Sequence, residues 1–178
     1  MNKQDVVAVV LGGPSSEAEV SRRTGGAIAE ALREKGYNAV EVELVPEKLV
    51  EQLREIDAKV VFNAVHGMYG EDGRLQSILE AIKMPYTGSG VLASAVAMDK
   101  VATKRFLISA NISTPKCLMY NKRFDNDMAK IEKEIIATFG VPVVIKAADQ
   151  GSSIGVEIVK AEADVAAALE NTFKYSDL

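Results

Sequence analysis

Two acidic residues follow a glycine turn near the start of the chain. The apolar run Val6–Leu11 leads into Gly12-Gly13-Pro14-Ser15-Ser16-Glu17-Ala18-Glu19, the pattern of a buried strand that ends in a turn and opens a helix. Such turns present backbone N–H groups and the positive end of a helix dipole to small anions. Carboxylates at the mouth of this turn predict that the site also receives a cation, such as a substrate ammonium group.

Helix-capping chemistry separates the two glutamates. Ser16 and Glu19 have the spacing of a capping box, which predicts Ser16 as the N-cap and assigns Glu19 to the helix. Glu17 has no capping duty. Its position in a first helical turn suits the dipole as well as a ligand, so both roles stay open for Glu17.

Two further strand ends carry groups suited to chemistry. His66, the only histidine, precedes a loop of three glycines and two acids at residues 67–73, which favours a site over a histidine that only bonds a loop carbonyl. Lys146 closes an apolar run and precedes Gln150-Gly151-Ser152-Ser153-Ile154-Gly155. Such a loop offers N–H groups and hydroxyls to phosphate oxygens, and the lysine supplies the counter-charge. An ordinary hairpin turn is the alternative.

The elements that must position these groups alternate along residues 1–98. Strand patterns at 6–11, 39–44 and 59–65 are each followed by a helical pattern, and helices are expected at 17–35, from 46, after 73 and at 91–98. Three βα units in a row predict an α/β domain with a parallel sheet covered on both faces. The residues of the first helix expected to face that sheet are Val20, Ala27, Ile28, Ala31 and Leu32.

Residues 99–178 have an α+β pattern. Helices are expected at 99–110, 125–139 and 161–173, and strands at 113–120, 141–146 and 155–159. In the first of these helices, Val101, Phe106 and Leu107 should face inward. Gly88-Ser89-Gly90 formally matches a dinucleotide fingerprint, but the preceding strand is short and no acid follows at about 20 residues. These glycines instead predict the close approach of a helix end to a neighbour.

Composition excludes several classes of protein. A net charge of −4 and a pI near 5.2 argue against nucleic-acid binding, and no apolar stretch is long enough to span a membrane. The single cysteine, Cys117, rules out an intramolecular disulfide and fits a reducing compartment. It is expected to be buried. We therefore expect a cytoplasmic protein without nucleic-acid or membrane partners.

Taken together, the motifs resemble those of the D-alanine–D-alanine ligases of the ATP-grasp superfamily. The matching segments cover most of the chain in the family's order: Leu11–Ser21, His66–Gly73, Pro85–Gly90, Met98–Lys100 and Gly151–Gly155. The resemblance implies a Rossmann-like, pre-ATP-grasp substrate-binding domain over 1–98 and the first, α+β portion of an ATP-grasp domain over 99–178. It also implies ATP-dependent joining of two D-alanines through an acyl phosphate, for peptidoglycan synthesis and the cell wall.

The resemblance also implies roles for individual residues. Glu17 would hold the ammonium group of the first D-alanine, and Ser152 would hydrogen-bond Glu17 as a second catalytic residue. His66 would lie near the carboxylate of that substrate. The positions that match the lining of the family's substrate pocket are Val20 and Ser21.

The phosphates of ATP have their own set of implied contacts. Lys100 and Lys146 would neutralise them, while Ser152 and Ser153 belong to the loop that closes over them. The sequence departs from the family at Ala147, where a proline is more usual. It also stops at Leu178, before the segment that clasps adenine and the carboxylates that bind Mg²⁺, so no metal ligand is expected in this chain.

This departure leaves alternatives open. The 178-residue chain resembles about the first half of a ligase, and by itself it is expected to be inactive. It could instead be a non-catalytic, truncated nucleotide-binding module. A ligase that takes D-lactate or D-serine as second substrate is a further alternative, and another ATP-grasp carboxylate–amine ligase is disfavoured by Glu17 and the 67–73 loop. Full-length members of the family are expected to be homodimers.

Overall fold

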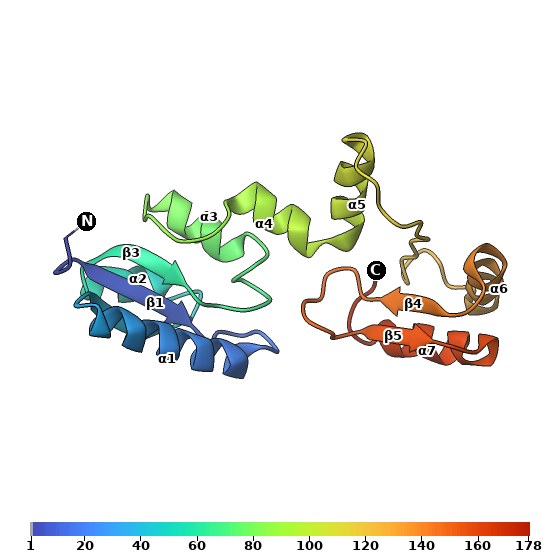
Figure 1. Ribbon diagram of the computed structural model, residues 1–178, viewed down its shortest axis with the longest axis horizontal. Helices are drawn as coiled ribbons and strands as arrows, with labels where there is room; N and C mark the ends of the chain where they lie inside the picture. Colours follow the sequence, from blue (N-terminus) through green and yellow to red (C-terminus); the bar gives the residue numbers. More distant parts are fainter. Residues whose placement is uncertain (1) are drawn as a thin grey trace. The chain divides into compact units, whose positions relative to one another are not determined.

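The computed structural model describes residues 2–178, which divide into two compact units (Figure 1). One unit ends at Ala97 and the other begins at Met98. The first is built on a parallel sheet and the second on an antiparallel hairpin.

The sheet of the first unit has β1 (Val6–Leu11) at its centre, between β2 (Asn38–Glu43) and β3 (Ala58–Asn63). Both pairings are parallel, as the three βα units predict. The continuous apolar sequence of β1 suits its central place, because helices cover both of its faces. Tyr86 extends the sheet by an isolated parallel bridge to Val61 in β3.

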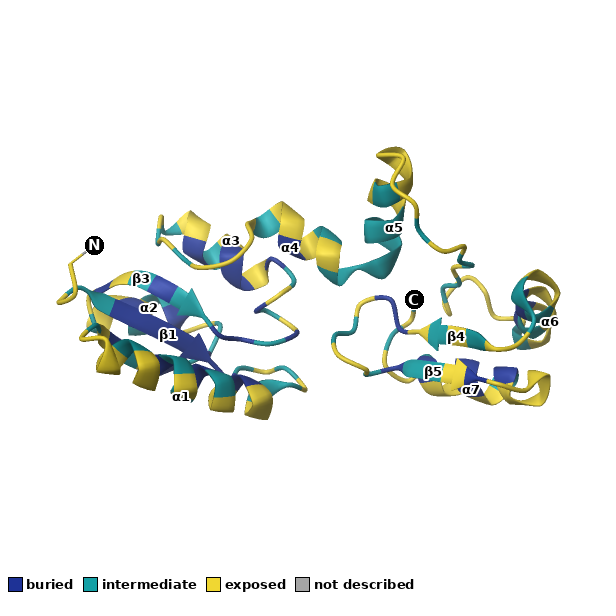
Figure 2. Cartoon of the chain, in the orientation of Figure 1, coloured by how far each residue is buried: buried dark blue, intermediate teal, exposed yellow. Residues whose placement is uncertain are grey.

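Alternate residues of β1 feed two separate cores, as the pleat of a strand requires. Ala8 and Val10 pack with α2 (Leu49–Glu55) and α3 (Arg74–Ala81), whose side chains with less than 2% exposure are Leu49, Leu53, Leu75 and Leu79. Val9 and Leu11 pack on the other face with Ala29 of α1 (Ala18–Glu34). Helices on both faces are therefore confirmed, and Figure 2 shows β1 buried along most of its length.

The face of α1 that meets the sheet differs from the prediction. Its buried residues are Ser21, Gly25 and Ala29, spaced four apart, with Ile28 and Leu32 half-buried beside them. The expected inward residues Val20, Ala27 and Ala31 are exposed, so that part of the prediction is wrong. The reason is distance: small side chains at every fourth position allow the helix to approach β1 closely. A Cβ added to Gly25 would lie 2.6 Å from the Cβ of Leu11.

Two expectations about the rest of the first unit change in detail. α2 begins at Leu49 rather than near Pro46. The glycines before α4 (Val91–Met98) are not needed for close packing, since a Cβ on Gly88 would meet nothing within 4 Å and one on Gly90 would meet Glu80 Oε1 only at 3.6 Å. Gly88 instead has φ of +107°, a conformation that favours glycine.

The second unit is built around a hairpin of β4 (Val143–Lys146) and β5 (Val156–Val159), paired antiparallel. One face of the hairpin packs on α6 (Met128–Phe139) and α7 (Val165–Thr172), which follows the short 3₁₀ helix η1 (Glu162–Asp164). The buried side chains of this core are Ile131, Ile135, Val159, Val165, Ala168 and Leu169. The loop 147–154 connects the two strands of the hairpin.

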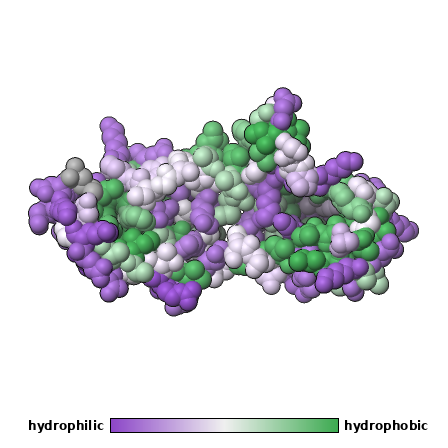
Figure 3. Space-filling view, in the orientation of Figure 1, coloured by the Kyte–Doolittle hydropathy of each residue, from purple (hydrophilic) through white to green (hydrophobic). Residues whose placement is uncertain are grey.

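Residues between α5 (Lys100–Ser109) and α6 were predicted less well. Residues 113–120 form no strand. Pro115 has no N–H to give to a sheet, and its carbonyl accepts a hydrogen bond from Lys104 Nζ at 2.5 Å. α5 buries no side chain, so the inward orientation expected for Phe106 is wrong: its exposure is 56%. Figure 3 shows an apolar surface over α5. Cys117 is half-buried rather than buried.

Candidate functional site

The glycine turn after β1 uses its N–H groups internally. Gly12 N donates to Ser21 Oγ at 2.8 Å, and Gly13 N donates to Glu43 Oε1 at 3.2 Å. The expectation that these two glycines present free N–H groups to an anion is therefore wrong. Gly12 has φ of +70°, and a Cβ there would lie 2.1 Å from Glu43 Oε1, so only glycine fits beside this carboxylate.

Arg22 also stabilises the turn, through Glu43. Its guanidinium donates to both carboxylate oxygens of Glu43, from Nη2 at 2.7 Å and from Nε at 3.1 Å. These hydrogen bonds, more than the one from Gly13 N, lower the pKa of the Glu43 carboxyl from its ordinary 4.5, while partial burial acts in the opposite direction. Glu43 is therefore ionised at neutral pH and ties the turn to β2 and to α1.

The start of α1 differs from the predicted capping box. The N-cap is Glu17 rather than Ser16, and no side chain caps the helix. Ser15 instead forms the turn that precedes the helix, since its Oγ accepts from Glu17 N at 3.0 Å and its carbonyl accepts from Ala18 N at 3.1 Å. Glu19 does not reach back: its side chain is 90% exposed and pairs with Arg22 at 3.5 Å. Glu17 thus has no capping hydrogen bond from its side chain.

Ser21 joins the carboxyl ends of two strands. It is fully buried, and its hydroxyl donates to Ala64 O at 2.7 Å while it accepts from Gly12 N. Because both roles of this hydroxyl are filled, Ser21 holds the edge of the sheet together at the end of β1 and just beyond β3. Val20 points elsewhere and is 41% exposed.

The structure brings Glu17 and the His66 loop together at this edge. A Cβ added to Gly67 would lie 3.2 Å from Glu17 Oε1 and 2.7 Å from Ser15 Oγ, so the carboxylate lies directly against the backbone next to His66. The loop is fixed by its own acids: Gly67 N donates to Glu71 Oε2 at 2.8 Å, and Tyr69 N donates to an Asp72 carboxylate oxygen at 3.0 Å. Both loops follow strands of one parallel sheet, whose carboxyl ends lie at the same edge.

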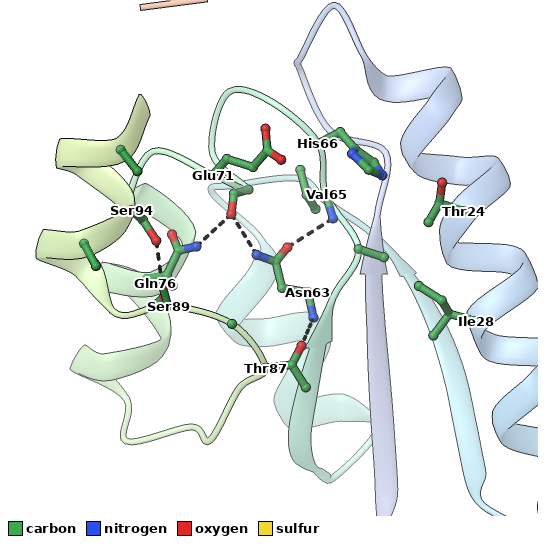
Figure 4. A pocket seen from close by; sticks show the side chains of 15 residues that line it. Thr24, Ile28, Asn63, Val65, His66, Glu71, Gln76, Thr87, Ser89 and Ser94 are labelled. Carbon is green, nitrogen blue, oxygen red and sulfur yellow. Dashed lines mark hydrogen bonds between the residues drawn. The ribbon is translucent and has the colours of Figure 1, made fainter. Parts of the chain in front are cut away.

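A pocket of about 400 Å³ opens beside His66 (Figure 4). Thr24 and Ile28 of α1 line one side and Ser94 of α4 lines another, with Glu71 at the loop. Residues that sequence reasoning missed form its polar floor: Asn63, Gln76 and Thr87. A signal for Gln76 existed, because it falls on the buried stripe of α3 with Leu75 and Leu79, where a glutamine is unusual.

In the second unit, Lys100 and Lys146 approach the same loop. Lys100 Nζ donates to the carbonyls of Ala147 at 2.9 Å and Gln150 at 2.6 Å. Burial, followed by the positive charge of Lys146, lowers the pKa of Lys100. Lys146 ends β4 and is exposed, as its position at a strand end predicts.

The serines of the loop lie on the surface. Ser152 and Ser153 are exposed, and Ser152 adopts φ of +53°. Gly155 closes the loop where a Cβ would lie 2.7 Å from Ala147 Cβ. Glu17 and Ser152 belong to different units, and their hydrogen bond stays a prediction.

Residues 2–178 lack both a metal-binding cluster and a membrane-spanning helix. No group of three or more His, Cys, Asp or Glu side chains is arranged to hold a metal ion. Over the same residues, no helix has the length and apolar character needed to cross a membrane.

Comparison with known proteins relates this geometry to one family. The family profiles described as D-ala D-ala ligase N-terminus and C-terminus match residues 43–89 and 106–177. The D-alanine–D-alanine ligase of Moorella thermoacetica is 45% identical over 170 residues, which are 95% of this chain and 55% of that protein. The chain belongs to the D-alanine–D-alanine ligase family. It spans about half the length of the curated relatives it matches.

Solved structures of the family share the fold. The D-alanine–D-alanine ligase from Bacillus anthracis superimposes with a TM-score of 0.84 at 34% identity, over 97% of this chain and 55% of that one. A structure described as the same enzyme complexed with ATP gives a TM-score of 0.81 at 32% identity, over 97% and 56% of the two chains. The predicted α/β class and the family resemblance are confirmed.

Proposed function

We propose that this chain supplies the first-substrate site and part of the ATP site of a D-alanine–D-alanine ligase. The observation that carries the proposal is the meeting of Glu17 and the His66 loop at the carboxyl edge of the sheet, 3.2 Å from Glu17 Oε1 to the Cβ position of Gly67. A carboxylate without a capping duty is suited to an ammonium group, and an adjacent imidazole is suited to a carboxylate. An amino acid presents both groups.

The reaction that this site would serve has two steps. The γ-phosphoryl group of ATP passes to a carboxylate oxygen of the first D-alanine, and ADP leaves. The amine of the second D-alanine then attacks the acyl carbon, and phosphate leaves as the peptide bond forms. In both steps Glu17 holds the first substrate by its ammonium group and His66 lies at its carboxylate, so that the reacting carbon keeps one position.

The second unit would bind the phosphates. Lys146 is exposed at the end of β4, and Lys100 lies behind the 147–154 loop with its charge disfavoured by burial and by Lys146. An anion beside the two lysines would relieve that repulsion, which favours phosphate. Ser153 and Ser152 would close over the phosphates as part of the loop, and Ser152 would also reach Glu17 when substrate is bound.

The remaining roles follow the family. We propose that the unit up to Ala97 is the substrate-binding domain and that the unit from Met98 is the first portion of the ATP-grasp domain. Val20 and Ser21 are assigned to the substrate pocket, with Ser21 acting through the strand ends it joins. Residues 2–178 hold no carboxylate cluster that fits Mg²⁺, so we assign none of them a role in binding that ion. We also propose that the full-length protein forms homodimers and is located in the cytoplasm.

A chimera tests the activity. Residues 1–178 are joined to the part of the Moorella thermoacetica ligase that lies beyond the matched region, and the intact relative is the positive control. We expect D-alanine-dependent release of ADP and phosphate, with D-alanyl-D-alanine as product. A folded chimera that releases no ADP with D-alanine would contradict the proposal.

A further inference from the structure

The carbonyl of Gly70 accepts hydrogen bonds from two side chains of different elements, half-buried Asn63 and buried Gln76. Asn63 Nδ2, at the end of β3, and Gln76 Nε2, in α3, each donate to Gly70 O at 2.7 Å (Figure 4). Asn63 is itself fixed, because its Oδ1 accepts from Val65 N at 3.0 Å and its N donates to Thr87 Oγ1 at 3.1 Å. The middle of the 66–73 loop is thus fastened to the strand that leads into it.

Gln76 donates to Gly70 O, but its own side-chain oxygen stays without a hydrogen-bond partner among residues 2–178. The residue is 3% exposed. A buried acceptor without a partner is destabilising. An apolar residue at position 76, beside Leu75 on the buried face of α3, would avoid that cost. Packing alone therefore does not explain a glutamine here.

At Gly70 the loop packs closely against the backbone of Val65. A Cβ on Gly70 would lie 2.0 Å from the carbonyl oxygen of Val65, so the loop folds back onto the residue that precedes His66. A displacement of Gly70 must therefore move the backbone on both sides of the imidazole. The two donors therefore act at a point of the loop that packs against the residue preceding His66.

We infer that Gln76 is a positioning residue for His66 and the 66–73 loop. Its relevance to the reaction rests on the proposed function, in which His66 lies at the substrate carboxylate. The unpaired Oε1 is the cost of placing a second donor on Gly70 O. Asn63 alone keeps that carbonyl satisfied, but only the pair fixes its position from two directions.

The variant Gln76→Leu in the 178-residue chain tests this inference. It removes the donor and the unpaired acceptor together, so we expect the thermal midpoint to stay or rise. We expect hydrogen exchange at the amides of Gly67, Tyr69 and Glu71 to become about 3- to 10-fold faster, the scale of one net hydrogen bond. The imidazole NMR signals of His66, unambiguous because it is the only histidine, should shift or broaden.

Gln52→Leu is the matched control. Gln52 also has a buried Oε1 without a partner among residues 2–178, and its Nε2 donates to Glu43 O at 3.3 Å, away from the loop. It should leave the His66 signals and the loop amides unchanged. The inference is overturned if Gln76→Leu leaves both readouts unchanged, or if it accelerates exchange throughout the first unit in step with a lower midpoint. Neither readout requires ligation, so a failure of the ligase proposal would be seen separately.

Discussion

Gly25 and Gly26 are neighbours in α1 with opposite surroundings. A Cβ on Gly25 would lie 2.6 Å from Leu11 Cβ and 2.8 Å from Leu11 Cδ2, whereas a Cβ on Gly26 meets nothing within 4 Å. The Cβ of Leu11 is fixed by the backbone of β1 and has no rotamer that moves it away. Gly25→Ala must therefore push the helix from the sheet, while Gly26→Ala only improves the helix.

The magnitudes follow from two terms. Replacing a helical glycine by alanine favours the helix by up to about 1 kcal/mol, and this gain is common to both variants. Overpacking a well-filled interface costs about 1–3 kcal/mol, and only Gly25→Ala incurs it. The helix term cancels between the variants, so their free energies of unfolding should differ by about 1–3 kcal/mol. Gly26→Ala should be more stable than the natural chain.

Urea denaturation followed by circular dichroism measures this difference, and hydrogen exchange of the β1 amides assigns it to the first unit. For a unit of this size, 1 kcal/mol corresponds to roughly 4–8 °C in the thermal midpoint. Equal stability of the two variants would refute the close approach of α1 to β1 through Gly25.

Three further predictions concern charge and packing. Glu43→Gln should remove a contribution of about 0.5 kcal/mol, small because the pair with Arg22 is nearly half exposed. Because the pKa of Glu43 is lowered, this contribution is present above pH 4.5 and is lost as the pH falls through the lowered value. The urea curves of the two chains should therefore converge at low pH. A difference in their free energies of unfolding that grows as the pH falls would contradict the prediction. Lys146→Gln in the chimera should weaken ATP binding about tenfold by calorimetry and raise the pKa of Lys100, and an unchanged Kd would exclude Lys146 from the phosphate site. Leu75→Ala should cost about 2–5 kcal/mol in urea denaturation, because Leu75 is fully buried; a loss below 1 kcal/mol would show that α3 is not part of the core.

The fold of the first unit was predictable because its signals are local. Val6–Leu11 is apolar throughout and becomes the central strand, and the loops that meet at the site follow β1 and β3. The orientation of α1 was not predictable from hydrophobicity. Its contact is made by Ser21, Gly25 and Ala29, and small residues give a weak hydrophobic signal even when they set the distance between two elements.

The candidate site was predictable in its location but less so in its details. Glu17, His66 and Lys146 all lie at strand ends, and the topology brings the first two loops together. The capping box failed because Ser15, one residue earlier, makes the turn that precedes the helix. Gln76 was missed because a single buried glutamine in a helix can be interpreted only when its partner, here Gly70 O, is known.

The role of Glu17 is the centre of this account, and one substitution in the chimera tests it most directly. Glu17→Gln keeps the size of the side chain and removes its charge, and no cap of α1 depends on that side chain. D-alanine-dependent ADP release should fall by about 100-fold, the loss of a charge-assisted hydrogen bond to an ammonium group, with the thermal midpoint unchanged. Release at the rate of the unsubstituted chimera would show that Glu17 does not hold the substrate.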